Sequence, residues 1–182
     1  MGCGSVVEIV VDRAGVRVAT GGAAAQFVLH CDPADAPALA GRLDVALPAA
    51  MLRVERTGGW RALHLAPDEW LLVGPPGGAA ALAARVDGAP EPHSLVDVGE
   101  RTQHLLVEGP AAPALLATAC PLDFDGSAFP PGAATRTLFG KVTIMLERDT
   151  DCFRMHYGRS FAEHMAALVR TAALDLPGMG PS

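Results

Sequence analysis

The chain has 182 residues, of which 50% are hydrophobic, and a formal net charge of -6. This length suits one domain or two small lobes packed together, and the apolar content favours a folded chain over a disordered one. The 14 basic residues are scattered singly and form no stripe that could follow a phosphate backbone, so we expect no binding to nucleic acid.

The amino-terminal region predicts no targeting signal. It lacks a basic start, and its largely apolar stretch over residues 6–11 is shorter than a signal-peptide core and ends at Asp12. Elsewhere Asp, Arg or Pro interrupts each alanine-rich stretch well before the roughly 18 apolar residues that a membrane span needs. We therefore expect a cytoplasmic protein that does not enter a membrane.

The first half of the chain shows the patterns of strands and short helices. Periodicity predicts strands near 6–11, 15–19 and 26–31, a short helix opened by Asp32 and Pro33, strands at 51–56, 60–65 and 69–74, and a helix near 78–86. The segment DGAPEPHS, residues 87–94, then breaks the pattern, and we expect the boundary between two lobes there.

The stretch LAPDEWLLVG, residues 65–74, places a proline and two carboxylates beside a tryptophan. Pro67 and Asp68 suit the central positions of a type I turn, so the stretch predicts a hairpin between two strands. Trp70 begins the second strand, where such a ring serves either the core or a contact with a partner. The sequence leaves that choice open.

The second half of the chain follows the element order of the first. We expect strands at 94–98 and 101–109, a helix from 110 to about 119, a loop over 120–134, a strand pair across 135–156 and a closing helix from 161 to about 174. The segments QFVLHCDPADAPAL and QHLLVEGPAAPALL also align without a gap, with Leu29 over Leu106 and Pro33 over Pro110.

This internal similarity predicts a duplicated unit. The element order suits an α+β fold made of ferredoxin-like (split βαβ) lobes. The expected organisation is a single domain over residues 1–182, with pseudo-repeat lobes at about 20–88 and 94–175. Chance similarity between two alanine-rich helices that start with proline is the alternative.

The segment HYGRSFAEH, residues 156–164, comes nearest to a catalytic motif. Gly158, Ser160 and Ala162 are similar to a G-x-S-x-G nucleophile elbow, but the required order of a downstream acid and then a histidine is absent. Ser160 with Glu163 also forms S-x-x-E, a capping box before an amphipathic helix. We therefore interpret Ser160 as a helix cap rather than a nucleophile.

No other set of residues predicts a complete site. The pairs Asp123 with Asp125 and Asp149 with Asp151 lie beside Gly, Ser or Thr, which is typical of turns, and a catalytic role is the less favoured interpretation. The four cysteines lack zinc-ligand spacing and are expected to be reduced and mostly buried, and no phosphate or dinucleotide loop occurs. We expect no catalytic residue, no cofactor-binding residue and no metal ligand in this chain.

Four segments together resemble one known family. They are LAPDEWLLVG, SLVDVGERTQHLLVEGPAAPALLATACPLDF, FPPGAATRTL and FRMHYGRSFAEHMAALV. In this order they are similar to the gamma subunit of heterotetrameric sarcosine oxidase, over roughly residues 26–174. The most specific pieces are PDEWL, the pair Gly109 and Pro110 with CPLD, and RSFA.

The resemblance implies a fold like the folate-binding domain of the glycine-cleavage aminomethyltransferase. It also implies a non-catalytic gamma subunit, in a complex that oxidatively demethylates sarcosine and passes the one-carbon unit to tetrahydrofolate. The expected partners are the alpha, beta and delta subunits, which hold FAD, FMN, NAD, tetrahydrofolate and zinc; no cofactor is expected in this chain. The chain is then part of an oxidoreductase complex without an active site of its own.

The sequence departs from the family pattern at one place. Asp97, Val98 and Gly99 stand where many relatives read Asp-Val-Ser, which weakens the choice of substrate more than the choice of family. The corresponding subunit of a related N-methyl amino acid dehydrogenase is one alternative. A free-standing ferredoxin-like small-molecule binding protein is the other. A KGCY-type motif is absent, since Val142 follows Lys141, and the length disfavours a complete aminomethyltransferase.

Overall fold

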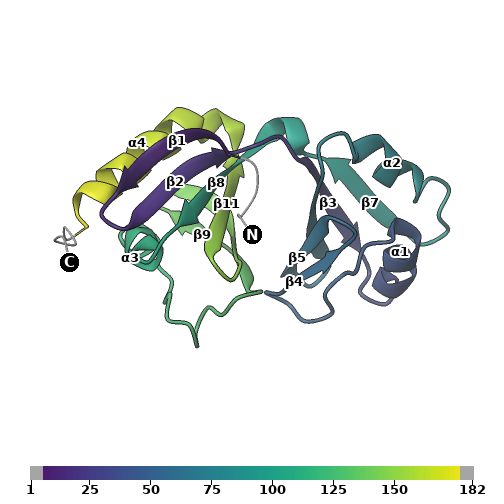
Figure 1. Cartoon of the computed structure of the whole chain (residues 1–182). Coiled ribbons are helices and arrows are strands. Elements are labelled where there is room, and N and C mark those ends of the chain that lie inside the picture. Colours follow the sequence, from purple (N-terminus) through teal and green to yellow (C-terminus); the bar gives the residue numbers. More distant parts are fainter. Residues whose placement is uncertain (1–5, 177–182) are drawn as a thin grey trace. The chain divides into compact units, whose positions relative to one another are not determined.

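The computed structural model describes residues 6–176, which form two compact units (Figure 1). The central unit comprises Ala23–Glu100, and the terminal unit combines Met1–Gly22 with Arg101–Ser182. Each unit contains one antiparallel sheet and short helices, so the predicted α+β class is confirmed. Over residues 6–176, no helix is both long and apolar enough to cross a membrane.

The terminal unit holds a six-stranded sheet in the order β1-β2-β8-β11-β10-β9, and every neighbouring pair is antiparallel. Its strands are β1 (Val6–Arg13), β2 (Val16–Gly21), β8 (Thr102–Glu108), β9 (Ala134–Phe139), β10 (Val142–Arg148) and β11 (Cys152–Gly158). Its helices are α3 (Ala112–Ala117) and α4 (Ala162–Leu174). A 3-10 turn, η2 (Arg159–Phe161), lies directly before α4, and another, η1 (Gly99–Arg101), precedes β8.

Alternation along the strands decides which face of this sheet forms the core, because successive side chains of a strand point to opposite faces. Val18 on β2 and Val107 on β8 are fully buried in one hydrophobic cluster. α4 adds Met165 and Val169, one helical turn apart, to the same cluster. Each such side chain contributes roughly 1.5–3 kcal/mol when it is fully buried.

Aromatic contacts hold the long loop between α3 and β9 against this core. The ring of Phe124 meets Phe153 edge-on at a centroid distance of 5.7 Å, and Phe129 stacks on Phe153 at 6.5 Å. The Arg148 guanidinium donates hydrogen bonds to the backbone carbonyls of Phe124 and Phe129, at 3.3 and 2.5 Å. The loop is therefore an integral part of the core.

The central unit holds a five-stranded sheet in the order β4-β5-β6-β3-β7, again antiparallel throughout. Its strands are β3 (Ala25–Cys31), β4 (Val54–Thr57), β5 (Trp60–Ala66), β6 (Glu69–Gly74) and β7 (His93–Asp97). Its helices are α1 (Ala36–Leu43) and α2 (Ala79–Ala84). Leu39 and Leu82 from these helices meet Phe27 and Leu72 from the sheet in a second hydrophobic cluster.

The predicted hairpin at PDEW is present, with Pro67 and Asp68 in the turn between β5 and β6. Trp70 on β6 has only 1% of its surface exposed, and its indole Nε1 donates a hydrogen bond to the Pro48 carbonyl at 3.1 Å. Its ring stacks on His64 at a centroid distance of 4.4 Å. Trp70 is therefore a core residue, which decides the choice that the sequence left open.

The two sheets share one strand order. The order β4-β5-β6-β3-β7 corresponds to β9-β10-β11-β8-β2, with α1 and α3 following the equivalent strands β3 and β8. The ungapped alignment does not extend to side-chain orientation, however. Leu29 belongs to the core cluster of the central unit. In β8 the aligned residue, Leu106, is not in the core cluster, and its neighbours Leu105 and Val107 are. A shift of one residue reverses the two faces of a strand.

Two expected boundaries differ from the structure. The lobe boundary expected at residues 87–94 overlaps the start of β7, which pairs with β3, and the central unit continues to Glu100. The stretch 135–156 was expected to hold two strands, but β9, β10 and β11 run through it. Gly140, at φ +60°, allows the tight turn that separates β9 from β10, because glycine adopts positive φ at little cost.

Candidate functional site

A network of buried polar side chains lies on the terminal unit's sheet. Glu147 of β10 pairs directly with Arg154 of β11, and His156 follows two residues further along β11. Phe153, Met155 and Tyr157 alternate with them in sequence and belong to the core cluster. Alternation therefore places the three polar side chains on the opposite face of the sheet.

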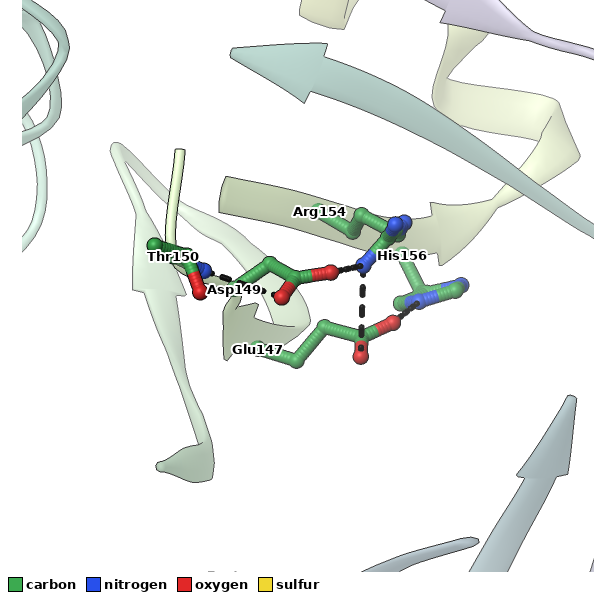
Figure 2. A network of polar contacts seen from close by, with 5 residues as sticks. All are labelled: Glu147, Asp149, Thr150, Arg154 and His156. Atoms are coloured by element: carbon green, nitrogen blue, oxygen red, sulfur yellow. Dashed lines mark hydrogen bonds and ion pairs between the residues drawn. The ribbon is translucent and has the colours of Figure 1, made fainter. Parts of the chain in front are cut away.

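The Glu147 carboxylate is the centre of this network. Its Oε1 lies 3.1 Å from His156 Nε2, and its Oε2 lies 3.7 Å from Arg154 Nη1. Figure 2 shows the carboxylate directed at both the Arg154 guanidinium and the His156 ring. The side chains of Glu147 and His156 have no exposed surface, and that of Arg154 is 8% exposed.

A loop residue completes the network. Arg154 Nη1 also lies 3.2 Å from Oδ2 of Asp149, whose other oxygen accepts a hydrogen bond from the Thr150 backbone N–H at 2.9 Å (Figure 2). One guanidinium thus meets two carboxylates. Charges that are shielded from water attract each other strongly. Much of this attraction only offsets the free energy that is needed to remove the charges from water.

A second histidine lies beside the network. The ring of His104, on β8, is 5.3 Å from that of His156, centroid to centroid. On β2, a Cβ atom at Gly21 would lie 1.8 Å from His104 Nε2. Only a residue without a side chain fits there, so Gly21 makes room for the His104 ring.

The geometry of this network suits a structural role. Both oxygens of Glu147 are engaged by side chains of the same sheet, and the guanidinium is shared between two acids. Such an arrangement fixes the register of β10 against β11. Within residues 6–176, no group of three or more His, Cys, Asp or Glu side chains could hold a metal ion.

The sequence does not predict this network, apart from Asp149, whose neighbours indicate a turn. A signal was present: Arg154 and His156 alternate with apolar residues in the strand FRMHYG, which places two polar side chains on one face. The partner acid comes from another strand. The contact of Arg154 and His156 with Glu147 depends on the pairing of β10 with β11, which the sequence of one strand does not reveal.

The capping-box interpretation of Ser160 is wrong. Ser160 lies within the 3-10 turn η2, and α4 begins only at Ala162, with Phe161 at the N-cap position. Neither η2 nor α4 has a side-chain capping hydrogen bond. The inserted turn moves the helix start past Ser160, so the side chain does not reach the N–H groups of the first turn of α4.

The other acid pair serves a turn, as the sequence suggested. The Asp125 backbone N–H donates to Asp123 Oδ1 at 2.8 Å, and both the N–H and the hydroxyl of Ser127 donate to Asp125 Oδ1. The Ser127 hydrogen bonds hold the pKa of Asp125 below its usual value. These contacts shape the loop.

The cysteines only partly follow expectation. Cys31 and Cys120 are free and buried, and burial raises the pKa of each thiol. Cys152 is buried too, but it is bonded in a disulfide, so the prediction of a reduced thiol is wrong for this residue. Spacing along the chain does not reveal which sulfur atoms meet in the fold. Cys3 lies outside the described residues.

The two antiparallel sheets and their strand orders match an aminomethyltransferase-like fold. The glycine cleavage system aminomethyltransferase T from Bartonella henselae matches 86% of this chain with 46% of its own, at a TM-score of 0.62; at 19% identity the likeness concerns the fold alone. A chain of heterotetrameric sarcosine oxidase from Corynebacterium sp. U-96 matches more fully. It is 27% identical, with a TM-score of 0.82, over 96% of this chain and 91% of that chain.

Sequence comparison identifies the family. Residues 29–175 match the model of the sarcosine oxidase, gamma subunit family, and the chain belongs to that family. Sarcosine oxidase subunit gamma from an Arthrobacter species is 34% identical over 61% of this chain, and that from Corynebacterium sp. strain U-96 is 34% identical over 70%. The matched stretches are 55% and 63% of the length of these relatives, so they span less than two thirds of either.

Proposed function

We propose that this chain is the gamma subunit of a heterotetrameric sarcosine oxidase and that it serves as a structural subunit without chemistry of its own. One observation carries the proposal: the fold corresponds over nearly its whole length to a chain of the Corynebacterium heterotetramer. The family match over residues 29–175 supports the same assignment.

In this proposal the complex oxidatively demethylates sarcosine and passes the one-carbon unit to tetrahydrofolate. FAD, FMN, NAD, tetrahydrofolate and zinc belong to the alpha, beta and delta subunits, so no residue of this chain is assigned to them. The gamma chain acts as one domain over residues 1–182 and works in the cytoplasm.

The buried network supports a structural role. Both carboxylate oxygens of Glu147 are held within the network, by Arg154 and by His156. A catalytic acid or base needs access to a substrate proton. The Glu147 and His156 side chains have no exposed surface.

Co-expression tests the proposal. The full chain carries an affinity tag and is produced with and without alpha, beta and delta chains of a heterotetrameric sarcosine oxidase. We expect all four to co-purify as one coloured complex that oxidises sarcosine, while the gamma chain alone is colourless and binds neither flavin nor nicotinamide nucleotide. Parallel assays with N-methylglutamate decide whether another N-methyl amino acid is the better substrate.

Two results would contradict the proposal. One is a gamma chain that recruits none of the three subunits. The other is a complex of alpha, beta and delta that assembles and oxidises sarcosine equally well without it. A stoichiometric flavin spectrum that stays with the isolated gamma chain after desalting would contradict the absence of a cofactor.

A further inference from the structure

The strand β7 presents an open edge of the central sheet. It pairs with β3 on one side, and no described strand pairs with its other side. The Val98 N–H donates to the Gln26 carbonyl at 2.8 Å, so alternation directs the backbone groups of Ser94 and Val96 toward β3. The backbone groups of the intervening residues, His93, Leu95 and Asp97, therefore point outward along the free edge.

An open cavity adjoins this edge. Its volume is about 500 Å³, and its walls come from the end of α2, the following loop and β7: Ala83, Ala84, Val86, Asp87, His93 and Leu95. Leu95 packs at the margin of the core cluster, so the cavity lies on the helix-covered face of the sheet. Small methyl groups on α2 leave space for a side chain from outside.

Contacts to α1 hold the cavity in shape. The Arg42 guanidinium lies 2.9 Å from Glu91, and His93 Nδ1 lies 2.8 Å from the Glu91 carbonyl oxygen. The Arg85 guanidinium donates a hydrogen bond to the Leu43 carbonyl. The loop that closes one side of the cavity is thus anchored, which lowers the entropy cost of binding there.

The terminal unit shows what occupies the equivalent edge. There β2 takes the place of β7 in the strand order, and β1 pairs antiparallel with its outer side. Val10 and Val11 of β1 pack on the hydrophobic core, and α4 lies along the strand (Figure 1). The central sheet has the corresponding strands and α2, but no strand within residues 6–176 corresponds there to β1.

We propose that the outer edge of β7 binds an extended segment of another protein chain, antiparallel to β7, as β1 binds to β2. The segment donates and accepts backbone hydrogen bonds at His93, Leu95 and Asp97, and one of its apolar side chains enters the cavity beside Ala84. This is strand addition to a sheet edge, in which backbone bonds supply affinity and the cavity supplies specificity.

The charge of the edge defines the segment further. Asp87 and Asp97 are both exposed, at the cavity wall and at the end of β7. Lysine or arginine residues on either side of the apolar side chain would complement them. Five residues of extended chain, about 17 Å, match the length of β7. Identification of the partner as the alpha, beta or delta subunit rests on the proposed function.

A pair of matched variants tests the cavity. Ala84→Arg places a long cationic side chain in the cavity, and Ala81→Arg makes the same change at another exposed position of α2 that does not line it. Each is assembled with the alpha, beta and delta chains. We expect Ala84→Arg to weaken assembly by about tenfold or more, whereas Ala81→Arg assembles like the parent.

Hydrogen–deuterium exchange tests the edge in the unmodified chain. The outward amides of Leu95 and Asp97 should exchange quickly in the isolated gamma chain and slowly in the complex. Rapid exchange of both amides in an assembled complex overturns the inference while the proposed function stands. Normal assembly of Ala84→Arg does the same.

Two further outcomes would show that the edge of β7 does not bind a segment of a partner subunit. Protection of β7 in the isolated chain that increases with protein concentration means that a second copy occupies the edge, and the inference is wrong. Failure of the four chains to form a complex overturns the proposed function, and the proposed occupant with it.

Discussion

Glu147 Oε1 lies 3.1 Å from His156 Nε2, and neither side chain has any exposed surface. This contact, with the ion pair to Arg154, joins β10 to β11 on the face opposite the hydrophobic core. Charges in such a place are stable only together, because removing one leaves the others without compensation away from water.

Glu147→Ala should therefore cost about 3–5 kcal/mol of unfolding free energy. The substitution takes the Glu147 carboxylate away from both the Arg154 guanidinium and the His156 ring. Glu147→Gln, which keeps an oxygen for hydrogen bonding, should cost less. Urea unfolding of the purified chain measures both, with the exposed Glu55→Ala as control. A loss below about 1 kcal/mol for Glu147→Ala would show that the network adds little stability.

Trp70→Phe tests the buried indole. The change removes the hydrogen bond from Nε1 to the Pro48 carbonyl and leaves that acceptor buried, which should cost about 1–3 kcal/mol in addition to the lost ring contacts. Trp60→Phe makes the same change of ring at another buried tryptophan and serves as the control. Equal losses for the two variants in denaturant titrations would mean that the Pro48 contact contributes nothing.

Local chemistry predicted the elements of the fold well where turn residues mark them. Pro67 and Asp68 defined the hairpin, and the expected strand over 69–74 coincides with β6. Long-range pairing was not predictable in the same way. The assignment of β1 and β2 to the unit that also contains α4 depends on contacts between residues more than 80 positions apart, such as Val18 with Val107.

The site was less predictable than the fold. Asp149 looks like a turn residue in sequence, and it is one. Its carboxylate also accepts a hydrogen bond from Arg154 of the next strand. Ser160 shows the opposite error, since the S-x-x-E pattern is present without the cap. A single 3-10 turn before α4 removes the geometry that the pattern assumes. Whether such a turn forms depends on how the chain leads from β11 into α4.

Ser160→Ala should consequently change the unfolding free energy by less than about 0.5 kcal/mol, as expected for a surface position without a capping bond. Thermal or urea unfolding of the variant checks this. Phe161→Ala, at the neighbouring exposed position, is a suitable companion. A loss near 1 kcal/mol for Ser160→Ala would restore the capping box.

Two glycines should respond in opposite directions to alanine. At Gly74 on β6, a Cβ atom would lie 2.4 Å from the Trp60 ring, so Gly74→Ala forces the buried indole to move and should destabilise the chain. At Gly41 in α1 a Cβ atom meets nothing within 4 Å, and Gly41→Ala should stabilise by about 0.5–1 kcal/mol through helix propensity. Melting temperatures that shift the same way in both would contradict this contrast.

Because of Tyr157, the only tyrosine of the chain, we expect the free energy of unfolding to fall in alkali. Burial raises the pKa of its phenol from 10.0 to about 12, because the charged phenolate is disfavoured away from water. The folded state then holds the proton more tightly than the unfolded state. Its contribution, roughly 2–3 kcal/mol, is complete below pH 10 and is lost as the pH rises through about 12.

Tyr157→Phe provides the comparison, since it retains the ring in the core but cannot ionise. Unfolding free energies of parent and variant between pH 9 and pH 12 should diverge, with the parent falling more steeply above about pH 10. Tyrosinate absorbance of the folded parent should appear only near pH 12, where the raised pKa of Tyr157 lies. A phenol that titrates near pH 10 while the chain is still folded would show that water reaches Tyr157. The two stability curves would then run in parallel.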